Sequence, residues 1–294
     1  DAITIFPDYF APLKLSLLGK AQDQEIVEFG IHDLRAYSTD NHNTVDDTPY
    51  GGGAGMVMLP EVWGKALDPL MTPDTDLIIL TPAGKRFDQP MAAKFSNSQH
   101  LVFACGRYEG IDDRVRQYYE TKNNHPEMNC EKLYLDAFTQ VSTAGGERYP
   151  DVFDAITDRI NRGTLVMNYV GHGGEVGLAE ERVVTIPQIQ AWKNINALTL
   201  FVSATCEFTK YDDPSRVSAG EWMSLNPNGG AIALMTTTRS VFFGVNSSVG
   251  LAFYNNAFVR DAAGKPRTFG EIVEQTKNVA LSSDKRGAQG KYEV

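Results

Sequence analysis

The stretch that decides the fold of the second half of this chain is residues 164–174, which read TLVMNYVGHGG. It begins as an apolar, β-branched run and ends in a histidine between glycines, so it predicts a strand over Thr164–Val170 followed by a turn. A second run, LTLFVSATC at residues 198–206, predicts a strand over Leu198–Ala204 that ends at Cys206. Strands alternate with helical patterns around both runs, which indicates a parallel α/β sheet.

His172 and Cys206 thus follow two successive predicted strands and are 34 positions apart. If these strands are adjacent and parallel, both side chains emerge at the same edge of the sheet. A cysteine becomes a nucleophile when an imidazole lies within hydrogen-bond reach, because the thiolate is the reactive form. The N–H groups of Gly173 and Cys206 would then form an oxyanion hole. The pattern points to cysteine-dependent acyl transfer.

Each residue of this pair also has a plainer interpretation. A cysteine at the end of a strand is more often a small buried apolar residue. A lone histidine in a glycine turn is usually an exposed turn residue. The occurrence of both residues at successive strand ends favours catalysis over these alternatives.

The composition of the whole chain sets broad limits. Its 294 residues are 42% hydrophobic and 22% charged, as in a soluble globular protein with one large or two medium domains. No apolar run is long enough to cross a bilayer, so no transmembrane segment is expected. The first residues, DAITIFP, form a strand-like run and show no secretion signal. Cys105, Cys130 and Cys206 occur in unrelated contexts, which predicts neither a disulfide framework nor a metal site.

Charge is distributed unevenly along the chain. The net charge is −10, and residues 1–120 contribute −8 of it, from 10 basic and 18 acidic residues. A surface that binds RNA normally carries a basic patch. The acidic first half therefore argues against RNA binding by that half alone.

Three glycine-containing segments stand out in the first half: DDTPYGGGAGM at residues 46–56, LTPAG at 80–84 and ACGRYEGID at 104–112. The last two follow the predicted strands Asp76–Leu80 and His100–Cys105, where open α/β sheets bind ligands. Glycines there let backbone groups approach a flat, polar ligand closely. No Gly-Lys-Ser/Thr follows the first segment, so it is not a phosphate loop. Any one of the segments alone would be an ordinary turn.

In this order the three segments closely resemble bacterial tRNA (guanine-N1)-methyltransferases, from Ile3 to Val115. The resemblance implies a trefoil-knotted parallel α/β domain that binds S-adenosylmethionine, works as a homodimer and methylates a tRNA guanine. The Gly51–Met56 segment would face the guanosine. The residues implied to line the cofactor pocket are Pro82 and Gly84 in one loop, and Gly106, Tyr108, Glu109 and Gly110 in the next.

The first half also departs from that family. The third cofactor loop, which threads the knot, has no counterpart after Glu120. The helical domain that holds tRNA and the aspartate thought to act as general base are missing as well. The expected fold of this half is an incomplete trefoil-knot-type sheet whose cofactor pocket lacks one wall. We expect weak cofactor binding at most, and we do not favour tRNA as a partner of this truncated half, although the family binds it.

The second half carries a different resemblance, on NYVGHGG at residues 168–174 and SATCEF at 203–208. These motifs are similar to gingipain-type cysteine peptidases, in particular the sortase branch of type IX secretion. The resemblance implies a caspase-like α/β sheet, a peptide or protein substrate, no cofactor, Cys206 as nucleophile and His172 as general acid/base. Relatives orient the histidine with an acidic residue; Glu175 and Asp136 are both candidates. The family's closing Leu-Gly-Asp-Pro segment is not found.

One arrangement would join the two halves. The peptidase family begins with a strand and a helix ahead of a strand that matches Glu131–Phe138, and Leu101–Cys105 followed by a helix over Ile111–Lys122 has that order. We therefore expect Leu101–Cys105 to pair with Glu131–Phe138 in one sheet.

The sequence as a whole is interpreted as a chimera of two truncated enzymes: a methyltransferase-like fragment over residues 1–120 and a gingipain-type fragment over residues 121–294. The leading functional hypothesis is hydrolysis or transpeptidation at Cys206 and His172. The alternatives are S-adenosylmethionine-dependent methylation of tRNA and an inactive hybrid. Methyltransferase relatives are cytoplasmic and sortase relatives lie at the outer membrane surface, so the compartment stays open, as does the oligomeric state.

Overall fold

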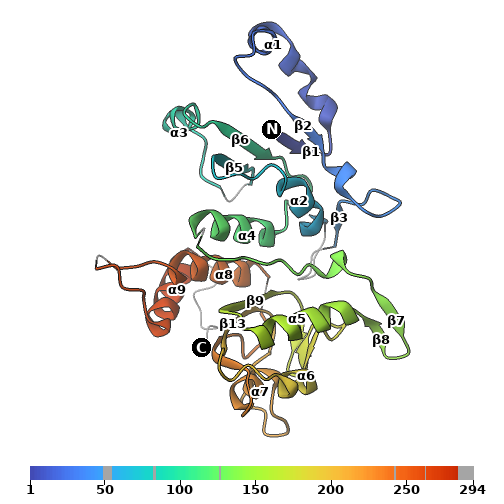
Figure 1. Ribbon diagram of the computed structural model, residues 1–294, viewed down its shortest axis with the longest axis vertical. Helices are drawn as coiled ribbons and strands as arrows, with labels where there is room; N and C mark the ends of the chain where they lie inside the picture. Colours follow the sequence, from blue (N-terminus) through green and yellow to red (C-terminus); the bar gives the residue numbers. More distant parts are fainter. Residues whose placement is uncertain (49–54, 82–83, 126, 242, 262, 284–294) are drawn as a thin grey trace. The chain divides into compact units, whose positions relative to one another are not determined.

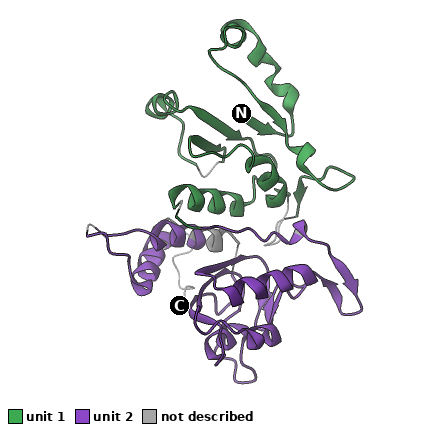
Figure 2. Ribbon diagram, in the orientation of Figure 1, with its two compact units in different colours: residues 1–128 green, residues 129–294 purple. Residues whose placement is uncertain are grey.

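The structure is a computed structural model that describes residues 1–48, 55–81, 84–125, 127–241, 243–261 and 263–283. Within these ranges the side chains at positions 136, 243–248 and 281–283 are not described. The chain divides into two compact units, Asp1–Met128 and Asn129–Val294 (Figure 2). The sequence pattern placed this boundary at residue 120.

The first unit contains a four-stranded, fully parallel sheet with the strand order β2-β1-β6-β5 (Figure 1). Its strands are β1 (Ala2–Thr4), β2 (Ile31–Asp33), β5 (Thr75–Ile79) and β6 (His100–Ala104). Its α-helices are α1 (Ser16–Asp23), α2 (Pro60–Leu67), α3 (Gln89–Phe95) and α4 (Asp113–Asn124), and its 3-10 helices are η1 (Pro7–Lys14) and η2 (Leu34–Tyr37). A short antiparallel pair, β3 (Asp46–Asp47) and β4 (Val57–Met58), completes it. The predicted alternation of strands and helices is confirmed.

The core of the first unit explains why α2 and α4 lie where they do. Ile3 and Val102 from the central strands, Trp63 from α2 and Tyr119 from α4 are almost wholly buried in one apolar cluster. The hydroxyl of Tyr119 donates a hydrogen bond of 2.6 Å to Asp68 Oδ1. Trp63 and Tyr119 are large aromatic side chains, and each buries more apolar surface than an aliphatic neighbour.

The apolar spacing of residues 12–21 is typical of one amphipathic helix, but the structure divides this segment. η1 ends at Lys14 and α1 begins at Ser16. Ser16 has a φ of 56°, which lies in the left-handed region and interrupts a right-handed helix. Apolar spacing alone did not reveal this break.

The second unit contains a three-stranded parallel sheet with the order β14-β13-β9. Its strands are β9 (Val166–Val170), β13 (Thr199–Ala204) and β14 (Ala231–Met235). Its helices are α5 (Pro150–Arg162), α6 (Ile186–Ala191), α7 (Ala219–Leu225), α8 (Phe243–Ala257) and α9 (Phe269–Ser283). The strands β9 and β13 were predicted within two residues of their observed bounds.

Helices cover both faces of this sheet because successive residues of β13 point to opposite sides. Phe201 is fully buried in a cluster with Ile156 and Ile160 of α5. Val202 is buried in a second cluster with Phe253 of α8 and Val273 of α9. A parallel sheet with apolar side chains on both faces is typical of α/β proteins, so the predicted α/β class is confirmed for this unit as well.

Two small antiparallel sheets were not predicted. β10 (Gly173–Gly174), β11 (Gly177–Leu178) and β12 (Val184–Thr185) form a three-stranded sheet directly after β9. β7 (Val141–Thr143) and β8 (Gly146–Arg148) form a hairpin before α5. Their strands are only two or three residues long, which is too short to give a detectable alternation of apolar and polar residues.

The strand expected over Glu131–Phe138 is wrong. The segment contains a 3-10 helix, η3 (Leu135–Ala137), and no strand. Leu133, Leu135 and Phe138 instead pack against the α5 side of the core. Their spacing therefore reflects contact with a core, without the backbone ladder that defines a strand.

The expected joint sheet is wrong for a related reason. A strand has two edges, and both edges of β6 are occupied within the first unit, by β1 on one side and β5 on the other. Leu101–Ala104 consequently belongs to the sheet of the first unit, and no partner strand exists at Glu131–Phe138.

Candidate active site

The strands that carry His172 and Cys206 are adjacent and parallel, as predicted. β9 and β13 pair from Leu200 and Val166 up to Ala204 and Val170. His172 lies two residues beyond Val170, and Cys206 lies two residues beyond Ala204. The two residues therefore occupy equivalent places after the ends of neighbouring strands. His172 is exposed and Cys206 is half-buried.

The sulfur of Cys206 lies against the backbone of Val241, which follows β14. The Val241 N–H donates to Sγ at 3.5 Å, and Sγ lies 3.7 Å from the Val241 carbonyl oxygen. An N–H directed at sulfur stabilises negative charge that develops there. Glu207, the next residue, has a left-handed φ of 51°. Such backbone strain in a residue other than glycine is concentrated at functional sites.

The turn that carries His172 is fixed through its backbone. The His172 carbonyl oxygen accepts a hydrogen bond from the Ala179 N–H at 2.8 Å and another from the Tyr169 hydroxyl at 2.6 Å. The imidazole ring itself has no hydrogen bond or ion pair to any residue that the structure describes. The position of the ring is thus determined by the turn, and its nitrogens are left for a substrate or for Cys206.

Gly173, the proposed oxyanion donor, sits where only glycine fits. A Cβ added there would overlap Thr205 Oγ1. Gly173 is paired with Leu178 in the β10–β11 ladder, and the bond from Ala179 N–H to the His172 carbonyl marks this as a non-hydrogen-bonded pair. In such a pair the N–H points away from the partner strand. The Gly173 N–H therefore faces away from β11.

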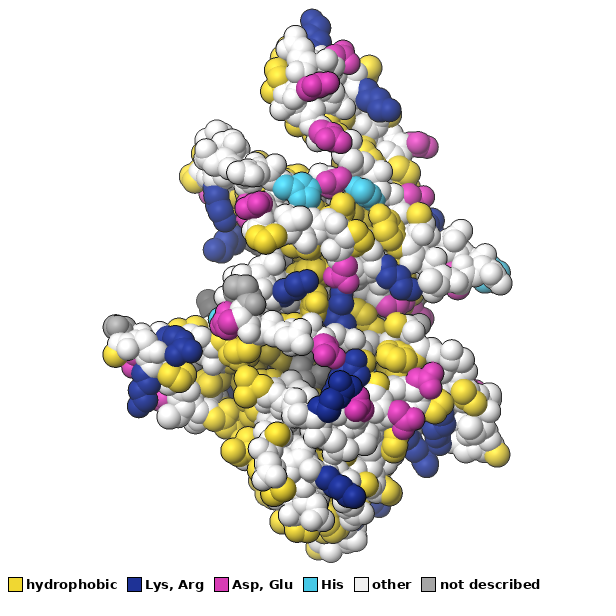
Figure 3. Space-filling view, viewed as in Figure 1, with side chains coloured by type: hydrophobic (Ala, Val, Ile, Leu, Met, Phe, Trp, Pro, Cys, Tyr) yellow, Lys and Arg dark blue, Asp and Glu magenta, His cyan; other side chains and the backbone are white. Residues whose placement is uncertain are grey.

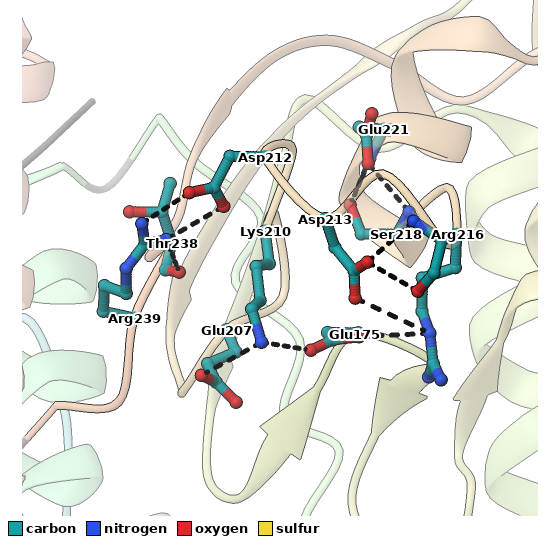
Figure 4. Close-up of polar contacts among 11 residues, drawn as sticks. Glu175, Glu207, Lys210, Asp212, Asp213, Arg216, Ser218, Glu221, Thr238 and Arg239 are labelled. Carbon is teal, nitrogen blue, oxygen red and sulfur yellow. Dashed lines mark hydrogen bonds and ion pairs between the residues drawn. The ribbon is translucent and has the colours of Figure 1, made fainter.

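Glu175 was one of two candidates to orient His172. Its carboxylate is bound to two cations instead: Oε1 lies 2.6 Å from Lys210 Nζ, and Oε2 lies 3.3 Å from Arg216 Nε (Figure 4). Among the described residues it makes no ion pair with His172. The other candidate, Asp136, has a side chain outside the described part. The acidic partner of His172 consequently stays unassigned.

Lys210 and Arg216 belong to a charged loop between β13 and α7 that the sequence analysis did not single out. Lys210 Nζ also lies 3.7 Å from Glu207 Oε1, and the hydrogen bond that the Lys210 ammonium donates to Glu175 is the main cause of its raised pKa. Arg239, after β14, holds Asp212 of the same loop with hydrogen bonds of 3.1 and 2.6 Å, which lower the pKa of that carboxyl group (Figure 4). The one available signal was the run of alternating charge that follows Cys206.

A cavity opens on the α8–α9 face of the sheet, beside the same strand ends. Its lining includes Val170 and Ala204, which precede His172 and Cys206 by two residues, and Val241, whose backbone contacts the Cys206 sulfur. Thr237, Thr238, Arg239 and Lys277 also line it. No aspartate or glutamate is present among the lining residues that are described. Neither His172 nor Cys206 is among the described residues that line the cavity.

In the first unit, the loops expected to bind a cofactor emerge from the neighbouring strands β5 and β6. The Leu80 N–H donates to the Ala104 carbonyl at 3.2 Å, which holds the two strand ends together. Gly84 closes a turn on Thr81, with a hydrogen bond of 3.1 Å. Pro82 lies outside the described residues. Gly106 lies two residues after the end of β6 and packs near Ile111.

The loop after β6 is bonded to the end of the glycine-rich segment. Glu109 Oε2 accepts from the Met56 N–H at 2.8 Å, and the Met58 N–H donates to the Gly110 carbonyl at 3.0 Å. Tyr108 has a left-handed φ of 58°, and its ring is 48% exposed. Residues 51–54, expected to face a guanosine, lie outside the described part. The structure thus brings the loop expected to line the cofactor pocket against the end of the segment expected to face the guanosine.

Three further observations concern surface charge, metal-binding side chains and membrane-spanning helices. On the face drawn in Figure 3, basic side chains are interspersed with acidic and apolar ones. No group of three or more histidine, cysteine, aspartate or glutamate side chains able to hold a metal ion is found in the described ranges. No helix of the described part is long and apolar enough to cross a membrane.

Comparison with known families gives a match for each half. Residues 86–294 match the family described as Peptidase family C25. Residues 1–125 match the family described as tRNA (Guanine-1)-methyltransferase TrmD. The two ranges overlap at residues 86–125, which contain α3, β6 and α4. The strand and helix of the incorrect joint sheet, β6 and α4, thus lie in the segment that both family patterns match.

Curated relatives resemble the first half. A tRNA (guanine-N(1)-)-methyltransferase of Renibacterium salmoninarum is 58% identical over 119 residues, which are 39% of this chain and 45% of the relative. One of Clavibacter sepedonicus is 52% identical over 124 residues, covering 42% of this chain and 54% of the relative. One of Salinispora arenicola is 56% identical over 118 residues, which are 39% of this chain and 46% of the relative. The chain spans about half the length of the curated relatives it matches.

Proposed function

Because the chain belongs to peptidase family C25, we propose that its second unit breaks or transfers peptide bonds at Cys206, with His172 as general acid and base. The observation that supports this most directly is the register of β9 and β13. It places both residues two positions beyond paired strand ends. Neither residue alone would carry the proposal.

The proposed reaction follows from these groups. His172 takes the thiol proton of Cys206, and the resulting thiolate attacks the carbonyl carbon of the substrate, whose oxygen takes up the negative charge near the N–H groups of Gly173 and Cys206. The C–N bond then breaks, and His172 gives its proton to the leaving amine. A water molecule that gives a proton to His172 then attacks the remaining thioester; the C–S bond breaks, and His172 returns the proton to the Cys206 sulfur. An amine in place of that water would give transpeptidation.

The substrate is proposed to place a side chain in the cavity beside Cys206. Val170, Ala204 and Val241 connect the cavity to the two reacting residues. Binding there would orient the peptide bond toward the sulfur, and orientation of this kind supplies a large share of enzymatic rate enhancement. The peptidase unit needs no cofactor in this scheme.

Labelling with an alkylating peptide probe tests the proposal. Mass spectrometry of intact protein and tryptic peptides would quantify modification at Cys206 against Cys105 and Cys130 in the same molecule. We expect fast labelling of Cys206 in the wild type, loss of that labelling in His172→Ala, and no change in His42→Ala, which alters an exposed histidine of the first unit. Equal labelling of Cys206 in wild type and His172→Ala would reject the peptidase assignment.

A second candidate function is binding of S-adenosylmethionine by the first unit, favoured by the bonds between the loop after β6 and Met56–Met58. Gly84, Gly106, Tyr108, Glu109 and Gly110 would hold the cofactor, which supplies the methyl group in that family, and Pro82 would join them. The described residues supply two of the three loops of the knot-type pocket, so we propose weak binding without tRNA methylation. Titration calorimetry with S-adenosylmethionine tests this. If calorimetry shows no heat at millimolar S-adenosylmethionine, and Cys206 labelling does not depend on His172, both units are inactive and the chain is an inactive hybrid.

A further inference from the structure

We infer that the ion pair between Glu175 and Lys210 positions His172 relative to Cys206. The inference rests on the proposed function, because it concerns the geometry of the same two reacting groups. Glu175 is three residues after His172, and Lys210 is four residues after Cys206. Their ion pair of 2.6 Å therefore connects the two loops that carry the reaction (Figure 4).

The loop that carries Cys206 is held by backbone hydrogen bonds to the segment that follows β14. The Glu207 N–H donates to the Arg239 carbonyl at 3.3 Å, and the Thr209 N–H donates to the Thr237 carbonyl at 3.2 Å. These bonds fix the backbone on both sides of Phe208, whose ring is fully buried. Lys210 thus extends from a segment that is held against the end of β14.

The turn that carries His172 has fewer hydrogen bonds to β13 and to the Cys206 loop. The β9–β13 ladder ends with a long bond of 3.4 Å from the Gly171 N–H to the Ala204 carbonyl. Beyond it, the turn is bonded mainly to its own hairpin, through Ala179 and Leu178. Glu175 provides the links across: its carboxylate binds Lys210 and Arg216, and its carbonyl accepts from the Ala219 N–H at 2.7 Å.

Partial burial strengthens the electrostatic attraction between Glu175 and Lys210. The side chain of Glu175 is 15% exposed and that of Lys210 is 29% exposed, so solvent screens this pair less than a surface ion pair. The imidazole of His172 has no described partner that would hold it by itself. A shift of the hairpin would therefore move the ring directly, and a displacement near 1 Å can slow catalysis on the order of 100-fold.

Three substitutions test the inference. Glu175→Gln and Lys210→Met each remove one charge, and we expect each to lower kcat for peptide cleavage by about 10- to 100-fold with little change in KM. Lys210→Arg keeps the cation and should recover most of the rate. Arg216→Met is the matched control: it removes a cation from the same carboxylate, but from a side chain that is 51% exposed and ten residues after Cys206. We expect less than a threefold loss there.

Two readouts separate positioning from mere stability. Thermal unfolding reports whether each variant is folded, and the pH profile of Cys206 alkylation by iodoacetamide reports contact between the sulfur and the imidazole. Positioning predicts that the profile of Glu175→Gln moves toward that of His172→Ala while the protein stays folded. Two results would overturn this inference but not the proposed function. One is a lower melting temperature of Glu175→Gln with an unchanged pH profile of alkylation. The other is an equal loss of kcat in Arg216→Met and Lys210→Met. A wild type without His172-dependent alkylation overturns the proposed function as well.

Discussion

Gly173 packs against Thr205 so closely that a Cβ at Gly173 would overlap the Thr205 Oγ1 atom. This contact joins the residue after His172 to the residue before Cys206. The hydroxyl of Thr205 is buried and has no hydrogen-bond partner in the described part of the chain. The two loops are therefore in van der Waals contact at the point where the oxyanion is proposed to form.

The first prediction uses this contact. Gly173→Ala should force the two loops apart, lower the free energy of unfolding by about 1–3 kcal/mol and reduce Cys206 labelling by the peptide probe. Gly174→Ala is the control, because a Cβ there would meet no atom within 4 Å. Chemical denaturation and probe labelling measure the two effects. Equal behaviour of the two variants would contradict the close approach of the loops.

The pH dependence of the first unit is the second prediction. His32 Nε2 lies 2.7 Å from Asp1 Oδ1, and its Nδ1 lies 3.3 Å from the Tyr37 hydroxyl. Burial lowers the pKa of His32 below its ordinary value of 6.5. Below pH 6.5 the unfolded chain then binds more protons than the folded one, so stability should fall as pH decreases.

Urea unfolding at pH 7.5 and 5.5 measures that effect. The loss of stability on acidification should be smaller in His32→Gln than in the wild type. It should be unchanged in His42→Gln, because His42 is exposed. A wild type that gains stability at pH 5.5 relative to His32→Gln would show that the sign is wrong.

The third prediction concerns Cys105, at the end of β6. Burial raises the pKa of its thiol above the ordinary value of 9.0. The folded state then holds its proton longer than the unfolded state, so this group stabilises the fold less and less as pH rises above 9. Iodoacetamide should modify Cys105 slowly at pH 7.5 and faster above pH 9, or after unfolding. Rapid modification of native protein at pH 7.5 would show that the thiol is accessible, and Cys105→Ser should abolish the signal in either case.

The sequence predicted the parts of this protein that depend on local pattern. The runs that became β9 and β13 are apolar and β-branched, and the glycines around His172 mark the end of the first. Their parallel pairing followed from the α/β alternation, and it was confirmed residue by residue up to Val170 and Ala204. Such elements are predictable because strand length and side-chain period are properties of neighbouring residues.

Other features depend on contacts between distant residues and left no local mark. Leu133 and Leu135 look like alternate residues of a strand, yet they pack on the core without a ladder partner. Glu175 and Lys210 are 35 positions apart, and nothing in either segment indicates that they meet. A charged residue in a glycine-rich loop has many possible partners, and only the folded arrangement selects one.

The fourth prediction concerns the side chain that the cavity beside Cys206 accepts. Arg239 lines the cavity, but its guanidinium already binds Asp212 through two hydrogen bonds. Lys277 of α9 also lines it and makes no ion pair with any residue of the described ranges. With no acidic residue among the described lining, the cavity should favour an acidic side chain over a basic one, because opposite charge adds affinity and like charge opposes it.

Peptide probes that differ only in the residue before the reactive group measure this preference. Aspartate and glutamate probes should label Cys206 faster than lysine and arginine probes, and Lys277→Glu should reduce that ratio about tenfold, which corresponds to ~1.4 kcal/mol. Lys193→Glu makes the same change of charge on an exposed residue before the amino end of β13, outside the cavity. It should leave the ratio unchanged. Faster labelling by lysine probes in the wild type would mean that Lys277 does not face the bound side chain, because two ammonium groups repel each other.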